Sequence, residues 1–432
     1  MENSSETGQL HEQTNEPPQI EFLRDYTSVQ DINSPVILVN PAHGNEPYIL
    51  GTAIAQGVSK KLAEQGLGRA KIVVPLMYGE RQKRILIEEN PDSANLIHFD
   101  EEFGRILRDI TFQNGDFSSH LQQINHHYDD VESMLKGRFS FDAGDFQTRN
   151  LASSETQFFS PRNVVATIDT AARVVVEAPN RYFAFPILLT ELLGKARDAN
   201  LGFSDSDMQG VISRMLKVEA GYSQVFIPKI NPLSYKYADD LSKQPAEVNG
   251  RTRTYTPAMK REYSKELGKV SEPGIYMMFS GTGSNAETTR MLTKTAQDAG
   301  LTVYTPPWVD IEGSVHVTPE VLNDVNIKAV FGRGGWGTVW QVQNLALPWI
   351  VTPYEAGDDP EIYFNNKTIE ALKMGKVLTA ADMTSERLTE IINNFSVGTQ
   401  MINEKIKDEF GTLDGINFIS RAIADDFIQK KK

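Results

Sequence analysis

The sequence predicts an α/β protein made of two similar domains that face each other across a cleft. Residues 36–39 are a continuous apolar run, as expected of a buried parallel strand, and the segment KAVF at 328–331 is expected to be a strand of the second half. Such runs alternate with segments of helical periodicity, and a glycine-containing loop follows a strand in each half of the chain. The length of 432 residues fits two to three domains. Alternating strands and helices predict sheets that bind ligands at the carboxyl ends of their strands.

The first half contains one clear strand–helix–strand unit. The strand at 36–39 leads into the loop 40–47, and apolar residues then recur every four positions from Leu50 to Leu62. A second strand follows at 72–76. His43 therefore lies at the carboxyl end of a strand, where a neutral imidazole can act as a general base. A lone histidine is more often structural, so both interpretations stay open.

The rest of the first half is less regular. Residues 80–160 give no clear pattern, and His126–His127 is more typical of a solvated helix end than of a metal site. Strands are expected at 164–168 and 225–228, and a core helix begins near 186. The expected boundaries are a loosely attached segment at 1–30, a first domain at 31–235, a linker at 236–272, a second domain at 273–400 and a C-terminal helical segment at 401–432.

The second half contains two glycine-rich turns between a strand and a helix. One spans 280–285 and the other 332–338. Glycine lets the backbone approach a ligand closely, and free N–H groups at a helix N-terminus favour phosphate. The turn at 280–285 matches neither a P-loop nor the full dinucleotide fingerprint. Each is also compatible with a plain strand-to-helix turn, but two such turns in one domain favour a diphosphate site.

An acidic pair, Asp358–Asp359, precedes Pro360. Asp at the N-cap and Pro at the first helical position are a common helix start. The carboxylates would also suit sugar hydroxyls, and Asn365 and Asn366 lie about two turns further on.

Composition excludes several classes of function. Lysine and arginine total 43 against 57 acidic residues, a net charge of −14, so a broad nucleic-acid surface is not expected. The chain has no cysteine, which removes disulfides and thiolate chemistry. No apolar run reaches about 18 residues and the start lacks a secretory pattern, so we expect a cytoplasmic protein without a transmembrane segment.

The second half resembles the nucleotide-sugar glycosyltransferases of the GT-B fold, which include sterol glucosyltransferases and the UDP-glycosyltransferase superfamily. The residues that carry the resemblance are the motif RGGWGT at 333–338, Gln341, Pro348, Pro353, the acidic pair with Pro360, and the preceding segment 277–285. The clear resemblance covers about 273–378. The loop around His43 is similar to the acceptor-domain loop that carries the catalytic histidine in many members.

The resemblance implies roles for matched positions. It implies two Rossmann-like domains, a nucleotide-sugar donor such as a UDP-sugar, a small-molecule or lipid acceptor, and no metal or cofactor. His43 would be the catalytic base, and Asp358 and Asp359 would hold the donor sugar. The donor diphosphate would be bound by Ser280, Gly281, Gly283, Arg333, Gly335, Gly337 and Thr338. The ribose and base would lie near Gln341, Trp308 and Val309.

Three positions depart from the family pattern. Arg333 replaces a histidine, Gln341 replaces a glutamate and Asp359 replaces a glutamine. Arginine can still pair bidentately with phosphate. The departures leave two alternatives to sugar transfer: a UDP-sugar epimerase or hydrolase of the same fold, and a nucleotide-sugar-binding protein without activity.

Overall fold

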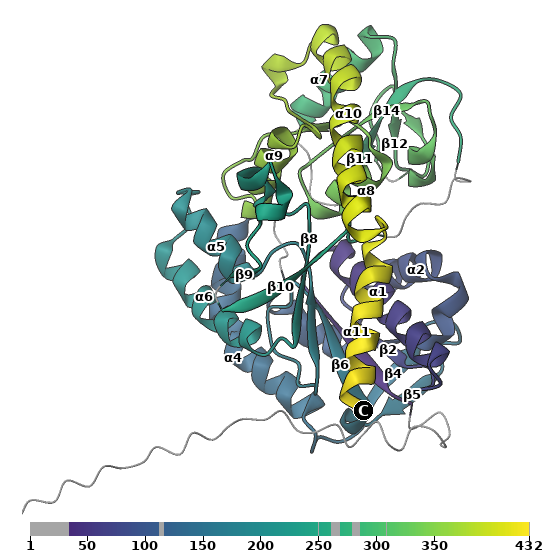
Figure 1. Cartoon of the computed structure of the whole chain (residues 1–432), viewed down its shortest axis with the longest axis vertical. Coiled ribbons are helices and arrows are strands. Elements are labelled where there is room, and N and C mark those ends of the chain that lie inside the picture. Colours follow the sequence, from purple (N-terminus) through teal and green to yellow (C-terminus); the bar gives the residue numbers. More distant parts are fainter. Residues whose placement is uncertain are drawn as a thin grey trace, which may run out of the picture.

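The protein consists of two α/β bodies, each built on a sheet of mainly parallel strands (Figure 1). The computed structural model describes residues 34–111, 116–248, 250–260, 268–278, 286–307 and 309–431. The predicted fold class is confirmed. The expected segment at 1–30 lies outside the described residues, as do Ser280, Gly281, Gly283 and Trp308.

The larger sheet belongs to the first body and has the strand order β5-β4-β3-β2-β1-β6-β7-β8-β10-β9. Its central strands pair in parallel, while β4, β5 and β9 run antiparallel to their neighbours. The strands are β1 (Val36–Pro41), β2 (Lys71–Pro75), β3 (Ile97–Asp100), β4 (Phe146–Asn150), β5 (Thr156–Phe159), β6 (Val164–Thr170), β7 (Arg181–Ala184), β8 (Gln224–Pro228), β9 (Glu247–Val248) and β10 (Arg251–Thr256).

The smaller sheet belongs to the second body and is parallel throughout, with the order β13-β12-β11-β14-β15-β16. Its strands are β11 (Gly274–Met278), β12 (Thr302–Thr305), β13 (Val315–His316), β14 (Ile327–Gly332), β15 (Trp349–Val351) and β16 (Gly375–Val377). The glycine-rich turn at 332–338 follows β14, as the sequence predicted, whereas the expected turn at 280–285 lies outside the described residues.

Helices cover the sheets, and the last two join the bodies. The helix α10 packs against the second body, and α11 continues down to pack along α1 of the first body (Figure 1). The helices are α1 (Asn45–Glu64), α2 (Gly79–Glu89), α3 (Glu101–Arg108), α4 (Phe117–Phe139), α5 (Leu189–Asp198), α6 (Asp205–Ala220), α7 (Ala286–Asp298), α8 (Trp336–Leu345), α9 (Pro360–Ala371), α10 (Ser385–Phe410) and α11 (Gly415–Lys431).

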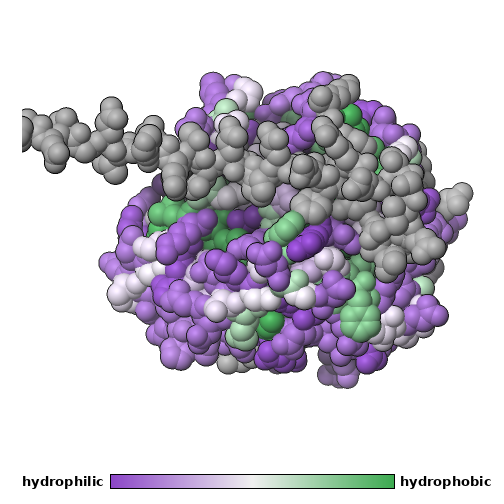
Figure 2. Space-filling model, turned by 90° about the horizontal axis from the view of Figure 1, so that it is seen from below, coloured by the Kyte–Doolittle hydropathy of each residue, from purple (hydrophilic) through white to green (hydrophobic). Residues whose placement is uncertain are grey.

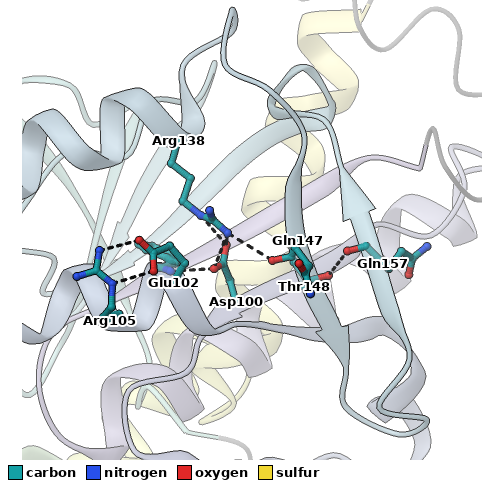
Figure 3. A network of polar contacts seen from close by, with 8 residues as sticks. Asp100, Glu102, Arg105, Arg138, Gln147, Thr148 and Gln157 are labelled. Carbon is teal, nitrogen blue, oxygen red and sulfur yellow. Dashed lines mark hydrogen bonds and ion pairs between the residues drawn. The ribbon is translucent and has the colours of Figure 1, made fainter.

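The region 80–160, which the sequence left unassigned, contributes α3, α4 and the β4–β5 hairpin to the first body. Figure 3 shows Arg138 of α4 reaching Asp100 at the end of β3. The Arg138 Nη2 lies 2.7 Å from each carboxylate oxygen, and Asp100 is fully buried. Asp100 also accepts a hydrogen bond from the Phe103 amide and so caps α3. One buried ion pair therefore ties α4 to the start of α3.

The segment expected as a linker at 236–272 contains strands. β10 pairs in parallel with β8, with Arg253 opposite Val225, and so extends the larger sheet. Its sequence RTRTYT alternates polar residues with β-branched threonine and an aromatic residue, which suits an outer strand. The first body thus includes residues up to 256.

The two bodies pack closely against each other. The ring of Phe185 lies 6.3 Å from that of Trp340 in α8, and the Thr368 hydroxyl in α9 donates to the Pro232 carbonyl at 2.9 Å. A single buried hydrophobic cluster contains both Tyr48 of α1 and Trp336 of α8. The interface is therefore a continuous packed core and not only a hinge.

Both sheets reverse their strand order at one place. In the larger sheet the chain moves outward from β1 to β3 on one side and returns to β6 on the other. In the smaller sheet the reversal lies between β11 and β14. Ligands of open α/β sheets bind outside the carboxyl ends of strands at such switch points. The loops after β1, β6 and β14 are therefore where a site is expected.

The surface is mainly polar. Figure 2 shows a mostly hydrophilic face on which hydrophobic residues gather in a few small areas. Within the part of the chain that the structure describes, none of the helices combines the length and the apolar character needed to cross a bilayer.

The contact between α1 and α11 provides a stability test. A methyl group added at Gly57 would lie 2.1 Å from the Ser420 Oγ in α11. We expect Gly57→Ala to lower the free energy of unfolding by about 1–3 kcal/mol, because overpacking moves one helix off the other. Denaturant titration measures this change.

A matched control is Gly194→Ala in α5, where an added methyl meets nothing within 4 Å. This variant should gain about 0.5–1 kcal/mol through lower unfolded-state entropy. Equal effects at the two positions would contradict the close approach of α11 to α1.

Candidate active site between the two domains

The loop after β1 places His43 at the interface between the bodies. The Ala42 amide donates to the Thr170 carbonyl of β6 at 2.8 Å, which fixes the start of the loop. Gly44 adopts φ of 87°, a conformation that favours glycine, and its amide donates to the Tyr78 hydroxyl at 2.7 Å. His43 is thus held at the larger sheet's switch point with little freedom of the backbone.

The His43 ring faces the second body. Its Nε2 lies 3.9 Å from the Oδ2 of Asp359, and the two side chains are 23% and 15% exposed. Burial, with a smaller contribution from the Arg173 guanidinium, lowers the pKa of His43 to about 3. The imidazole is therefore neutral at physiological pH, and its surroundings disfavour the protonated form.

Two further side chains of the first body lie beside His43. The His120 ring of α4 stands edge-on to the His43 ring, with 5.3 Å between centroids. Arg173, in the loop after β6, is 8% exposed, and its Nη1 donates to the Ala171 carbonyl at 3.0 Å. Burial lowers the pKa of His120 well below its usual value, and the positive charge of Arg173 acts in the same direction.

Two asparagines of α9 hold the glycine-rich turn after β14. The Asn365 Nδ2 donates to the Gly334 carbonyl at 2.6 Å, and the Asn366 Nδ2 donates to the Thr352 carbonyl at 2.9 Å. A methyl added at Gly334 would lie 2.4 Å from the Asn366 Oδ1, so a larger residue there would have to displace the Asn366 side chain. Asn365 thus positions the turn by a hydrogen bond, and Asn366 packs against it while bonding Thr352 after β15.

The acidic pair before α9 has two separate roles. Asp359 caps α9 by accepting a hydrogen bond from the Glu361 amide at 2.9 Å, and Pro360 begins the helix, as predicted. Asp358 pairs with Arg333, the residue that stands in place of the family's histidine. This ion pair connects the glycine-rich turn to the loop before α9. Burial raises the pKa of Asp358, against the effect of Arg333.

Negative charge is concentrated near Asp359. Burial raises the pKa of Asp359, while the Arg173 and Arg333 guanidinium groups oppose this rise. The pKa of Glu361, in the first turn of α9, is raised well above its usual value by burial and by the neighbouring Asp359. The positive charge of Arg173 therefore acts on two acids of the second domain, Asp359 and Glu361. It also acts on the two histidines of the first domain, His43 and His120.

The remaining predicted residues lie on the second body. Gly335 is the N-cap of α8, Gly337 and Thr338 form its first turn, and Gln341 is buried one turn later. Val309 is half-buried after β12, where its amide donates to the Pro306 carbonyl at 2.9 Å. The α8 N-terminus has no side-chain cap, so its backbone N–H groups suit an anionic ligand.

The site also contains residues that the sequence did not single out. They are Arg173, His120, Glu361 and Glu46. Only Arg173 could have been found from the sequence, because it is a charged residue that follows a strand, β6, within a few positions. The others depend on contacts between distant segments. No group of three or more potential metal ligands is found among the described residues.

The low pKa of His43 predicts how stability depends on pH. Between about pH 6.5 and pH 3 the folded state binds fewer protons than the unfolded state, so this group's contribution to stability falls as the pH is lowered. We expect His43→Gln to flatten the slope of unfolding free energy against pH between these limits. Denaturant titrations at several pH values measure the slope. The same substitution at exposed His126 controls for loss of a histidine, and an equal change there would contradict the assignment.

Comparison with known proteins gives one family match and several structural matches. Residues 293–415, from α7 to the start of α11, match the glycosyltransferase family 28 C-terminal domain. A search of curated proteins by sequence finds no match. The family match covers α8, α9 and the turn between β14 and α8.

The solved structures that the protein resembles share its fold at low sequence identity. One is UGT2 of Phytolacca americana complexed with UDP-2fluoro-glucose and pterostilbene, with a TM-score of 0.57, 11% identity and coverage of 91% of this chain and 99% of that one. Another is UGT71G1 of Medicago truncatula complexed with UDP-glucose, with a TM-score of 0.54, 11% identity and coverage of 92% and 99%. A third is the calicheamicin glycosyltransferase CalG4, with a TM-score of 0.51, 10% identity and coverage of 92% and 98%.

The structural likeness establishes the fold, and the family match relates residues 293–415 to one glycosyltransferase domain. Both agree with the resemblance that the glycine-rich turn and the acidic pair suggested. The protein has the GT-B fold, and residues 293–415 are similar to the glycosyltransferase family 28 C-terminal domain.

Proposed function

We propose that the protein transfers a sugar from a nucleoside diphosphate sugar, such as a UDP-sugar, to a hydroxyl group of a small-molecule or lipid acceptor. The second domain binds the donor at the N-terminus of α8, and the first domain binds the acceptor near His43. The cysteine-free sequence fits a reducing compartment, so a cytoplasmic location remains a prediction.

One observation carries the proposal: the His43 Nε2 faces Asp359 across the domain interface at 3.9 Å. Asp359 stands where the family holds the donor sugar, so the base and the sugar site belong to different domains and meet at one place. An acceptor hydroxyl beside His43 would then lie close to the reacting carbon of the donor. This proximity is what transfer between two substrates requires.

The reaction needs a proton acceptor and a stabilised leaving group. His43 takes the proton of the acceptor hydroxyl as its oxygen attacks the anomeric carbon, and the carbon–oxygen bond to the diphosphate breaks with its electron pair going to the phosphate. The Asp359 carboxylate stabilises the positive charge that develops on the imidazole. The α8 N–H groups, and Arg333 if it leaves Asp358, stabilise the leaving diphosphate. Direct attack inverts the anomeric centre.

The altered motif positions fit a working site. Arg333 is paired with Asp358 and so remains a cation within the donor region. His43 is neutral and faces the interface. These features favour a protein that transfers a sugar over a protein that binds a nucleotide sugar without activity. Neither epimerisation nor hydrolysis would need a domain that binds an acceptor beside the base.

Activity measurements on His43 and Asp359 test the proposal. We expect His43→Gln to lower kcat by about 10²–10⁴-fold, the usual contribution of a general base. Asp359→Asn should also lower kcat while leaving the melting temperature nearly unchanged, because asparagine is an equally good N-cap. His126→Gln on the exposed face of α4 is the matched control and should keep full activity.

Product analysis with UDP-sugars and an acceptor panel separates the reactions. A glycoside that forms only when acceptor is present supports transfer. An epimer or free sugar that forms without acceptor would establish one of the alternatives. Normal turnover by folded His43→Gln would rule out His43 as the base.

A further inference from the structure

The N-terminus of α8 already has an acidic side chain over it. Glu46, in the first turn of α1, packs against Gly337, so closely that a methyl at Gly337 would lie 2.7 Å from its Oε1 and 2.4 Å from its Cγ. The carboxylate therefore occupies the space above the first turn of α8. This contact comes from the first domain, although α8 belongs to the second.

A cation stands beside this carboxylate. The Lys260 Nζ lies 3.4 Å from the Glu46 Oε1, and the two side chains are 21% and 31% exposed. Lys260 belongs to the segment that follows β10 and leads toward the second body. Glu46 thus lies in the first turn of α1, against the first turn of α8 and beside one lysine, three sources of positive potential.

We propose that Glu46 occupies the place of a donor phosphate in the ligand-free protein, and that the diphosphate displaces it and takes over Lys260 as its counter-ion. The inference rests on the proposed function, since it assigns the α8 N-terminus to the donor diphosphate. It adds Lys260 to the diphosphate-binding residues and Glu46 as an internal competitor.

The arrangement has a physical consequence for affinity. Both a carboxylate and a phosphate are stabilised by the same N–H groups, so they cannot occupy the first turn of α8 together. The apparent dissociation constant for an anion is the intrinsic constant divided by the fraction of molecules in which Glu46 leaves the site free. Removal of the Glu46 charge should therefore tighten the binding of a diphosphate.

Calorimetry with inorganic pyrophosphate tests the competition without assuming a base or a sugar. We expect Glu46→Gln to tighten pyrophosphate binding by about three- to tenfold, from the typical strength of a carboxylate at a helix N-terminus with a nearby lysine. Glu46→Asp keeps the charge but withdraws the carboxylate by one methylene, so it should also tighten binding. The control Glu80→Gln removes a first-turn acid of α2 that pairs with Lys83, and it should change nothing.

Lys260→Gln provides the second arm. In the wild-type protein, this change weakens the binding of pyrophosphate and also weakens the binding of the Glu46 carboxylate that competes with it. The measured affinity for pyrophosphate should therefore change little. In the Glu46→Gln background the competitor is absent, and the same change should weaken binding by several-fold and flatten its salt dependence.

Three results would overturn the inference: equal pyrophosphate affinity in wild type, Glu46→Gln and Glu46→Asp; the same change in Glu80→Gln; or an equal effect of Lys260→Gln in both backgrounds. Pyrophosphate that binds none of the variants would overturn it too.

Sugar transfer with unchanged affinities would reject the inference and leave the proposed function standing. Affinities that change as expected, with no transfer, would reject the proposed function alone.

Discussion

The convergence of helix N-termini on the domain interface is the constraint on which the site depends. Parallel strands place the following helices with their N-termini at one edge of the sheet, and here two such edges face each other. α1 meets α8 through Glu46, and the Phe117 amide at the start of α4 donates to the Gly357 carbonyl before α9. Positive potential from four helix ends thus accumulates in one place, and acidic side chains compensate it.

This balance explains why so many charged groups can be buried together. Arg333 neutralises Asp358, and Arg173 supplies positive charge to the carboxylate of Asp359, which also caps a helix. Each acid therefore has a structural partner and lies within a region suited to an anionic substrate. Binding of a diphosphate exchanges one set of negative charges for another and does not create a new charged site.

Local sequence patterns predicted much of the fold. Apolar runs, glycine turns and the Asp359–Pro360 helix start depend on neighbours in the chain, so they could be recognised without the structure. Residues 80–160 could not be assigned, since α4 and the β4–β5 hairpin are fixed by the buried Arg138–Asp100 pair over a long separation. The position of Glu46 over Gly337 requires the two sheets to be placed first, and that of Arg173 beside His43 requires the pairing of β1 with β6. No local pattern encodes either contact.

The central claim is that the two switch points form one site in which the donor and the base meet. A crystal structure of the complex with a nucleoside diphosphate tests it most directly. The account predicts diphosphate oxygens within hydrogen-bond distance of the backbone N–H groups of Trp336 and Gly337, with the terminal phosphate toward His43. A nucleotide bound elsewhere, for example in the hollow of about 380 Å³ lined by Met134, Arg138 and Phe146, would contradict it.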